Sequence, residues 1–325
     1  MCSRIHRRNF IFGTAAMAAS LGAAKADVAF PAQLVKFIVP VPPGAQLDAV
    51  ARVLAESLSA KWGQAVIVED RPGAAGNLAA EIIAKSAPDG YTLFVTHPGP
   101  LVTNQWLYPK LGFDPKSLVP ITVLVKLSPV LVARTSLPAR NVPEFLAYAK
   151  ANPNKITYGS PGVGSTPHLA MEELAHAAGL HLVHVPYQGV APAQRDLLGG
   201  HIDIMIDMVG NALGQIRDGK IRALGVTTKT RLPELKDIAA ISETVPGFAF
   251  RDWFAVAAPP QTPPALADRL SGAFAMALQQ QNVRQRMYEF AALPVGNSPA
   301  EAAAFFRQES DRWRSTIETA SIRLD

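Results

Sequence analysis

The chain has 325 residues, of which 49% are hydrophobic and 18% are charged, and it contains one cysteine. This length and apolar content exclude a disordered chain and are enough for one large core or two smaller ones. The formal net charge of +5 would favour an anionic partner such as nucleic acid or a membrane surface, were it spread over the whole chain.

The first 26 residues have the layout of an export signal. A basic start with Arg4, Arg7 and Arg8 precedes an apolar stretch over 9–24, and Ala24-Lys25-Ala26 forms a small-residue exit. We therefore predict a signal peptide over 1–26 that is cleaved near Ala26. The alternative is a membrane anchor, but spanning a bilayer takes about 20 apolar residues and this stretch falls short.

The export signal also resembles the twin-arginine pattern R-R-x-F-L at Arg7-Arg8-Asn9-Phe10-Ile11. We expect this route, and the general secretory route is the alternative. Cleavage removes Cys2, so the mature chain can form no disulfide, thiolate nucleophile or Cys-ligated metal site. It also removes four of the 31 basic residues, which leaves 27 basic against 26 acidic residues and a net charge of +1. We therefore predict no nucleic-acid partner.

The first half of the mature chain alternates short apolar runs with segments of helical period. The pattern predicts strands at 35–39, 65–69 and 91–96, helices at 47–58 and 78–85, and a turn at 73–77. This β-α-β order implies a parallel sheet with right-handed crossovers and helices on both faces.

The same order restarts in the second half. Strands are predicted at 156–159, 182–185, 202–207 and 222–227, and helices at 142–151, 166–178, 191–198 and 212–219. An apolar run at 253–258 precedes helices at 264–280, 283–291 and 299–320.

The C-terminal helices have no sheet of their own, so we expect them to pack back on the first sheet. This predicts an α/β protein of two lobes, with crossings of the chain near Val125 and Phe250. Lobe 1 would contain 27–125 and 251–325, and lobe 2 would contain 126–250. Ligands of open α/β sheets bind at the carboxyl ends of the strands, which here would face the cleft between the lobes.

Three turns between a strand and a helix are rich in Gly, Pro and hydroxyl groups, at 42–48, 159–168 and 186–192. Glycine lets the backbone approach a ligand closely, and the first N–H groups of the following helix carry a partial positive charge. Such turns suit a carboxylate. The alternative is that Gly and Pro only terminate the strands.

Enzyme and metal motifs are incomplete in this chain. The segment 159–165 begins like a phosphate-binding P-loop but lacks its Lys, and Pro167 interrupts a dinucleotide-binding fingerprint. The four histidines of the second half (His168, His176, His181 and His184) lack a standard metal-ligand spacing. We predict no catalytic residue, no metal and no cofactor. The alternative is a secreted α/β hydrolase or acyl-transfer enzyme using Ser165 with His168, although no nucleophile elbow surrounds Ser165.

Eight segments, taken together in their order and spacing, identify a family resemblance. They are IVPVPPG at 38–44, DAVAR at 48–52, VEDRPGAAG at 68–76, PDGYTL at 88–93, YGSPGVGSTPHLA at 158–170, VPYQG at 185–189, DLLGG at 196–200 and GKIRAL at 219–224. Over 30–319 the chain resembles the substrate-binding receptors of the tripartite tricarboxylate transporter family, also called Bug receptors.

The resemblance implies a type II periplasmic binding protein, with two Rossmann-like lobes joined by a two-segment hinge (a Venus flytrap). Such a protein would be a periplasmic monomer that closes on a small organic acid. It would deliver this ligand to integral-membrane permease subunits or to a signalling partner. The ligand-sensing half of a transcription regulator has the same shape, but it needs a DNA-binding segment, and the export signal occupies the amino terminus.

The resemblance also implies which residues hold the ligand. One carboxylate would lie between Pro43, Gly44, Ala45, Gln46, Leu47 and Asp48 of one lobe and Ser160, Gly162, Val163, Gly164, Ser165, Thr166 and His168 of the other. Thr96, His97, Gln188, Gly189 and Asp207 would shape the remainder of the site.

Two positions depart from the family's pattern. Ala45 stands where a second glycine is usual, so a positive φ there would be strained. Asp70 stands where Asn is usual and adds a charge near the rim of the cleft.

Overall fold

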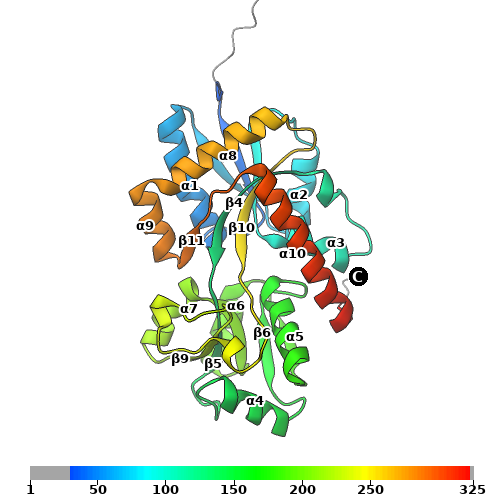
Figure 1. Ribbon diagram of the computed structural model, residues 1–325, viewed down its shortest axis with the longest axis vertical. Coiled ribbons are helices and arrows are strands. Elements are labelled where there is room, and N and C mark those ends of the chain that lie inside the picture. The colour runs from blue at the N-terminus through cyan, green and yellow to red at the C-terminus, as the bar shows by residue number, and fades with distance from the viewer. Residues whose placement is uncertain (1–29, 323–325) are drawn as a thin grey trace, which may run out of the picture.

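The computed structural model describes residues 30–322, so the predicted signal peptide over 1–26 lies outside the described residues. The described chain forms two lobes, one above the other, each built on a β-sheet with helices on both faces (Figure 1). No helix in this part of the chain is both long and apolar enough to cross a bilayer.

The first lobe contains a six-stranded sheet. Its order is β11 (Ala292–Pro294), β4 (Val119–Leu127), β10 (Trp253–Ala258), β3 (Thr92–Thr96), β1 (Val35–Val39) and β2 (Val66–Asp70). One face is covered by α1 (Gln46–Trp62), α8 (Pro264–Gln279) and α9 (Gln281–Glu289), around buried Phe37, Leu54 and Phe274. The other face carries α2 (Asn77–Ala84), α3 (Asn104–Leu107) and α10 (Pro299–Ala320).

The second lobe contains a five-stranded sheet. Its order is β7 (Val183–Pro186), β6 (Thr157–Ser160), β8 (Ile204–Met208), β5 (Pro129–Arg134) and β9 (Ile221–Val226). Helices α4 (Val142–Ala151) and α5 (Thr166–Ala178) pack on one face, and α6 (Val190–Gly199) and α7 (Val209–Arg217) on the other. Short helical turns lie at Ala74–Gly76, Gly99–Thr103, Pro115–Ser117, Pro233–Leu235 and Ile241–Glu243.

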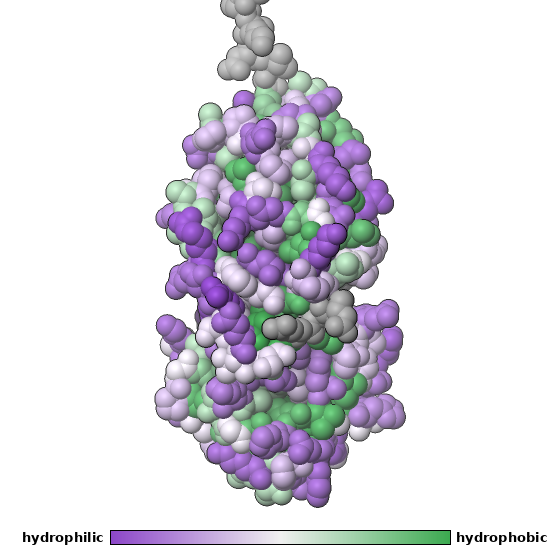
Figure 2. Space-filling view, turned by 90° about the vertical axis from the view of Figure 1, so that its right-hand side faces the viewer, coloured by the Kyte–Doolittle hydropathy of each residue, from purple (hydrophilic) through white to green (hydrophobic). Residues whose placement is uncertain are grey.

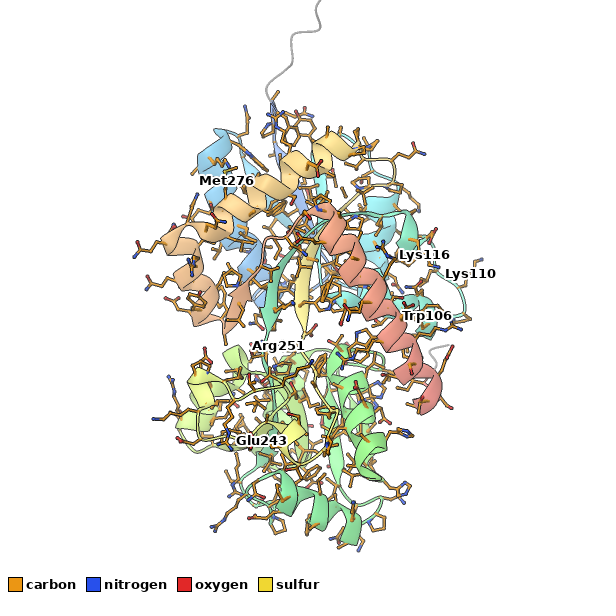
Figure 3. The ribbon with its side chains drawn as sticks, in the orientation of Figure 1. Trp106, Lys110, Lys116, Glu243, Arg251 and Met276 are labelled. Carbon is orange, nitrogen blue, oxygen red and sulfur yellow. The ribbon has the colours of Figure 1, made fainter. Side chains whose placement is uncertain are left out.

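The chain passes between the lobes through two adjacent segments. Ser128 is the single residue between β4 of the first sheet and β5 of the second. The return segment lies beside it, since Phe250 N donates to Thr227 O at 2.7 Å and Leu127 N donates to Asp252 O at 2.8 Å. Arg251 of the return segment lies between the lobes and donates to the Ser128 hydroxyl at 3.3 Å (Figure 3).

The prediction of parallel sheets is wrong for the strands next to these crossings. β1 is parallel to β2 and β3, and β6 is parallel to β7 and β8, but β10 and β5 run antiparallel to their neighbours. β10 and β5 are the strands by which the chain enters a lobe. An entering strand begins at the gap between the lobes, whereas the parallel strands end there, so its direction must be reversed.

Most predicted elements agree with the structure. The predicted helices at 142–151, 166–178 and 299–320 and the strands at 35–39 and 253–258 have the observed bounds. Strands β4, β5 and β11 are not among the predicted ones. β4 and β5 form one largely apolar run with only Ser128 between them, and β11 has three residues, so neither case shows the spacing of separate elements.

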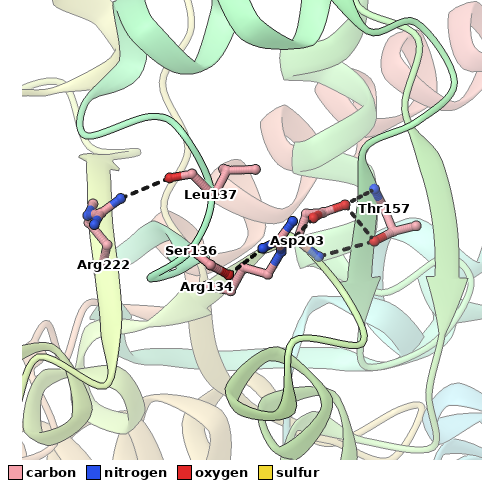
Figure 4. Close-up of polar contacts among 6 residues, drawn as sticks. All are labelled: Arg134, Ser136, Leu137, Thr157, Asp203 and Arg222. Atoms are coloured by element: carbon pink, nitrogen blue, oxygen red, sulfur yellow. Dashed lines mark hydrogen bonds and ion pairs between the residues drawn. The ribbon is translucent and has the colours of Figure 1, made fainter.

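A polar network closes the end of the second sheet that lies away from the first lobe. Asp203 accepts hydrogen bonds from Thr157 N at 2.8 Å and Thr157 Oγ1 at 2.9 Å, and from Arg134 Nε at 2.7 Å (Figure 4). Arg134 also contacts Ser136, and Arg222 donates to Leu137 O at 3.0 Å. The Asp203 carboxylate thus joins the strand starts of β6 and β8 to the end of β5.

Asp203→Ala should destabilise the second lobe. The change leaves the Thr157 amide and the Arg134 guanidinium without their acceptor, which costs about 1–3 kcal/mol of unfolding free energy. Urea denaturation measures this loss. Asp218→Ala is the matched control, because its ion pair with Lys220 is exposed on both sides and should change stability by less than about 0.5 kcal/mol. Equal effects of the two variants would contradict a structural role for the network.

Candidate functional site

Strand direction brings five loops to the gap between the lobes. β4 ends at the first crossing, and β10 is antiparallel to both β4 and β3, so β1 and β3 also end at the gap. β5 starts at the gap and is antiparallel to β8, so β6, β7 and β8 end there as well. Every predicted site residue lies at the end of one of these strands, on the loop that follows it, or in the first turn of the next helix (Figure 1).

The loop after β1 turns at Gly44. Gly44 has φ of 82°, whereas Ala45 has φ of −67° and ψ of 156°, the extended conformation usual for the residue before a helix. The strain expected for a positive φ at Ala45 is therefore absent, since the preceding glycine adopts the left-handed conformation. Helix α1 begins at Gln46, directly after this turn.

The Asp48 side chain supports this turn from within. It is 3% exposed, accepts a hydrogen bond from Gly44 N at 2.8 Å and pairs with Arg52 Nε at 2.7 Å. Arg52 binds Asp70 as well, at 2.8 Å. Burial and the neighbouring Asp48 carboxylate raise the pKa of Asp70. Asp70, which stands where the family usually has Asn, thus pairs with Arg52. Through Arg52 the Asp70 carboxylate joins the end of β2 to the first turn of α1.

The end of β3 carries a neutral histidine. His97 Nδ1 accepts a hydrogen bond from Gly99 N at 3.1 Å, and burial lowers the pKa of His97 to about 4. Thr96 is fully buried, and its hydroxyl donates to the His97 carbonyl at 3.2 Å. The His97 ring therefore carries its proton on Nε2, and it has no positive charge near neutral pH.

The loop between β6 and α5 is held by its own polar groups. Gly162 N donates to Ser160 Oγ at 3.2 Å, and Gly164 N donates to His168 Nδ1 at 3.0 Å. The Ser165 hydroxyl donates to Gly162 O at 2.7 Å. Ser165 and His168 therefore hydrogen-bond to different parts of the loop, and the nucleophile–base pair that the hydrolase alternative requires is not formed.

Helices α1 and α5 start at the gap with unused backbone donors. The first N–H groups of a helix have no partner within it and carry a partial positive charge. Five of these helix-start N–H groups, and one N–H of the loop before α5, make no hydrogen bond to any residue within 30–322. They are the N–H groups of Gln46, Leu47, Asp48, Val163, Thr166 and His168.

Asp207, at the end of β8, is buried with a full set of donors. Its Oδ2 accepts from Gln194 at 2.5 Å, and its Oδ1 accepts from Met208 N at 2.7 Å and Asn211 at 3.1 Å. Burial raises its pKa. Gln194 and Asn211 are not among the predicted site residues. Gln194 lies in the middle of α6 and Asn211 in the first turn of α7, and their amide side chains could have indicated donors for a buried carboxylate.

The loop after β7 lies against the loop after β6. Gly189 has φ of 105°, and its N–H donates to Pro161 O at 3.0 Å. Gln188 is exposed, and Pro43 of the opposite lobe is exposed as well. The loops therefore combine a fixed backbone with side chains that reach solvent.

Helix α10 of the first lobe packs on α5 of the second, where Arg312 Nη2 pairs with Glu173 Oε2 at 3.0 Å. Two further contacts between the lobes involve predicted site residues. At α7, a Cβ on Gly210 would collide with the Phe290 carbonyl oxygen, and it would lie 3.2 Å from Gln46 Nε2. Gln46 Nε2 itself donates to Phe290 O at 2.7 Å. The start of α7 in the second lobe thus packs closely against the first lobe.

The second contact joins α5 to the return segment. The Thr166 hydroxyl donates to Asp252 Oδ2 at 2.6 Å, and Trp253 N donates to Asp252 Oδ1 at 2.8 Å. Asp252 is 5% exposed, and burial raises its pKa to about 6. Asp252 is absent from the predicted site, because nothing in the local sequence shows that it meets a helix 86 residues away.

Asp252→Asn should change the pH dependence of stability. Since the folded pKa of about 6 lies above the ordinary value of 3.8, Asp252 contributes stability at low pH that is lost as the pH rises through about 6. We expect the variant to gain about 3 kcal/mol of unfolding free energy relative to the unmodified protein between about pH 4 and about pH 8. Urea denaturation across this range measures the difference. Asp218→Asn, at an exposed carboxylate, is the control. A difference that stays constant with pH would contradict the assignment.

Among residues 30–322, no group of three or more His, Cys, Asp or Glu side chains is arranged to hold a metal ion.

Comparison with known proteins identifies the family. A family profile described as "Tripartite tricarboxylate transporter family receptor" matches residues 50–322. The structure of R. palustris Rpa4515 with adipate is 34% identical, with a TM-score of 0.85 over 90% of this chain and 99% of that one. The periplasmic binding protein BugD is 34% identical, with a TM-score of 0.81 over 90% and 99%. MatC from Rhodopseudomonas palustris with bound malate is 31% identical, with a TM-score of 0.80 over 89% and 100%.

These likenesses confirm the expected two-lobed, type II periplasmic binding fold and the resemblance found in the sequence. The chain belongs to the tripartite tricarboxylate transporter family of substrate-binding receptors, the Bug receptors.

Proposed function

We propose that this receptor captures a small carboxylate-bearing organic acid between its lobes and delivers it to integral-membrane permease subunits or to a signalling partner. One observation carries the proposal. Helices α1 and α5, from opposite lobes, both begin at the gap with unused N–H groups, and no lysine or arginine is needed to make this region attractive to an anion.

The proposed contacts follow from this placement. The loop Pro43 to Asp48 and the loop Ser160 to His168 hold one carboxylate from the two sides. Thr96, His97, Gln188, Gly189 and Asp207 shape the rest of the site. The two lobes, 27–125 with 251–325 and 126–250, rotate about the paired crossings to enclose the ligand.

The ligand class is supported by the relatives. Rpa4515 is named with adipate and MatC with malate, and both are dicarboxylates. A charge-assisted hydrogen bond from each N–H contributes about 1.5–3 kcal/mol, and ordering and desolvation offset much of the sum. A micromolar affinity, about −8 kcal/mol, is the expected result.

The proposed location is the periplasm, reached after cleavage near Ala26. The relative BugD is a periplasmic binding protein. The face of this molecule shown in Figure 2 mixes hydrophilic and hydrophobic residues over both lobes. A receptor of this shape works as a monomer, because both halves of the site come from one chain.

Gly164→Val should abolish ligand binding and leave the rest of the fold intact. Gly164 has φ of 77°, which valine adopts only with strain, so the loop that offers Val163 and Thr166 N–H must rearrange. Isothermal titration with adipate and malate measures the loss. Gly200→Val is the control, because Gly200 has φ of 76° but lies at the far end of α6. An unchanged affinity of the Gly164 variant would refute the loop assignment.

Gly210→Ala should weaken ligand binding about tenfold or more by keeping the lobes apart. Its Cβ would collide with the Phe290 carbonyl oxygen of the first lobe. Gly214→Ala on the same helix is the matched control, since a Cβ there meets no atom within 4 Å. Titration of both variants with the same ligand measures the effect, and equal affinities would show that the observed lobe contact is not part of the bound state.

A further inference from the structure

A column of three stacked rings lies beneath the loop between β6 and α5. The rings of His168 and His184 stack with centroids 4.0 Å apart and an interplanar angle of 12°, and Tyr158 stacks on His184 at 4.7 Å and 17°. Tyr158 is fully buried and His168 is 4% exposed. The Tyr158 hydroxyl donates to Glu172, whose carboxylate also lies 4.0 Å from His168 Nε2.

Two of these rings reach the backbone of the loop. His168 Nδ1 accepts the hydrogen bond of Gly164 N at 3.0 Å, so this nitrogen carries no proton. His184 Nε2 lies 2.6 Å from Ser160 Oγ, and the same hydroxyl oxygen contacts both the N–H and the carbonyl of Gly162. One histidine thus fixes Gly164 directly, and the other fixes Gly162 through a serine.

Both histidines are neutral near neutral pH. Burial lowers the pKa of His168 to about 3, with the neighbouring His184 adding to the effect, and burial lowers the pKa of His184 to about 4. Neutral rings suit this position for two reasons. An imidazolium at His168 would lose the acceptor that Gly164 needs, and two stacked imidazolium ions would repel each other.

The rings act on the donors that the ligand would use. Gly162 and Gly164 have φ of 145° and 77°, and both N–H groups are turned to the loop's own acceptors. The unused N–H of Val163 lies between the two glycines, and that of Thr166 follows Gly164 by two residues, with Ser165 between them held to Gly162 O. Fixing the two glycines therefore limits the directions of both donors.

We propose that His168 and His184 are positioning residues for ligand binding, which orient the Val163 and Thr166 N–H groups through separate hydrogen bonds to Gly164 and Ser160. This inference rests on the proposed carboxylate site. It gives a positioning role to His184, which is not among the predicted site residues. It also gives the His168 side chain a positioning role in place of direct contact with the ligand.

Paired substitutions distinguish this role from simple packing. The terminal atoms of Asn lie near the position of a histidine Nδ1, and those of Gln lie near Nε2. His168→Asn should therefore keep the acceptor for Gly164 and retain most of the affinity for adipate or malate, whereas His168→Gln should lose about tenfold. At His184 the order should reverse, because Gln can reach Ser160 and Asn cannot.

Isothermal titration measures this reversal, with His176→Gln as the control, because His176 is exposed on the same helix α5. Thermal unfolding without ligand should be similar within each Asn/Gln pair. The same preference for Asn or Gln at both positions, or none at either, would overturn the proposal.

A second measurement needs no ligand. Amide hydrogen exchange of Gly164 N–H should be at least about tenfold faster in His168→Gln than in His168→Asn, because only the latter keeps an acceptor. Equal exchange rates would overturn the proposal independently. Absence of carboxylate binding by the unmodified protein, with the exchange difference present, would instead refute the proposed function and leave the hydrogen bond to Gly164 established.

Discussion

The paired crossings between the sheets constrain everything else in this molecule. Leu127 N bonds to Asp252 O, so the outgoing and returning segments lie side by side as a narrow connection. Because the chain enters each lobe there, the entering strands β5 and β10 run away from the gap, and the parallel strands run toward it. Five loops therefore meet at one gap, and residues separated by more than 100 positions in sequence can act on one ligand.

The near-neutral charge predicted for the mature chain limits how strongly the gap can attract an anion from a distance. With a predicted net charge of +1, long-range attraction for an anion is small, so the helix starts must supply the positive potential. The acids nearby would oppose an anion if they were free. Asp48 is paired with Arg52, and Asp207 and Asp252 are buried with donors and raised pKa values. The carboxylates of these acidic groups are therefore bound by donors of the loops and of Arg52.

Local patterns predicted the helices and most strands well, because amphipathic period and the Gly and Pro residues at their ends are properties of short segments. The same patterns located the loops at 42–48, 159–168 and 186–192, and the family resemblance added Thr96, His97 and Asp207. Local patterns gave wrong predictions where the direction of a strand or the conformation of a residue depends on another part of the chain. The reversed direction of β5 and β10 follows from entry into a lobe, and the unstrained Ala45 follows from the turn at Gly44.

The sequence by itself determined the family, the two-lobed α/β class and the Gly- and Pro-rich loops, and it predicted a near-neutral mature chain, since each follows from composition or from adjacent residues. The tertiary structure decided what the polar side chains of those loops do. Ser160 and His168 hold backbone groups, Thr166 reaches Asp252 across the lobes, and His184 stacks beneath the loop. Hydrogen bonds and ring stacking depend on distances that only the folded chain sets, so no local pattern could have assigned them.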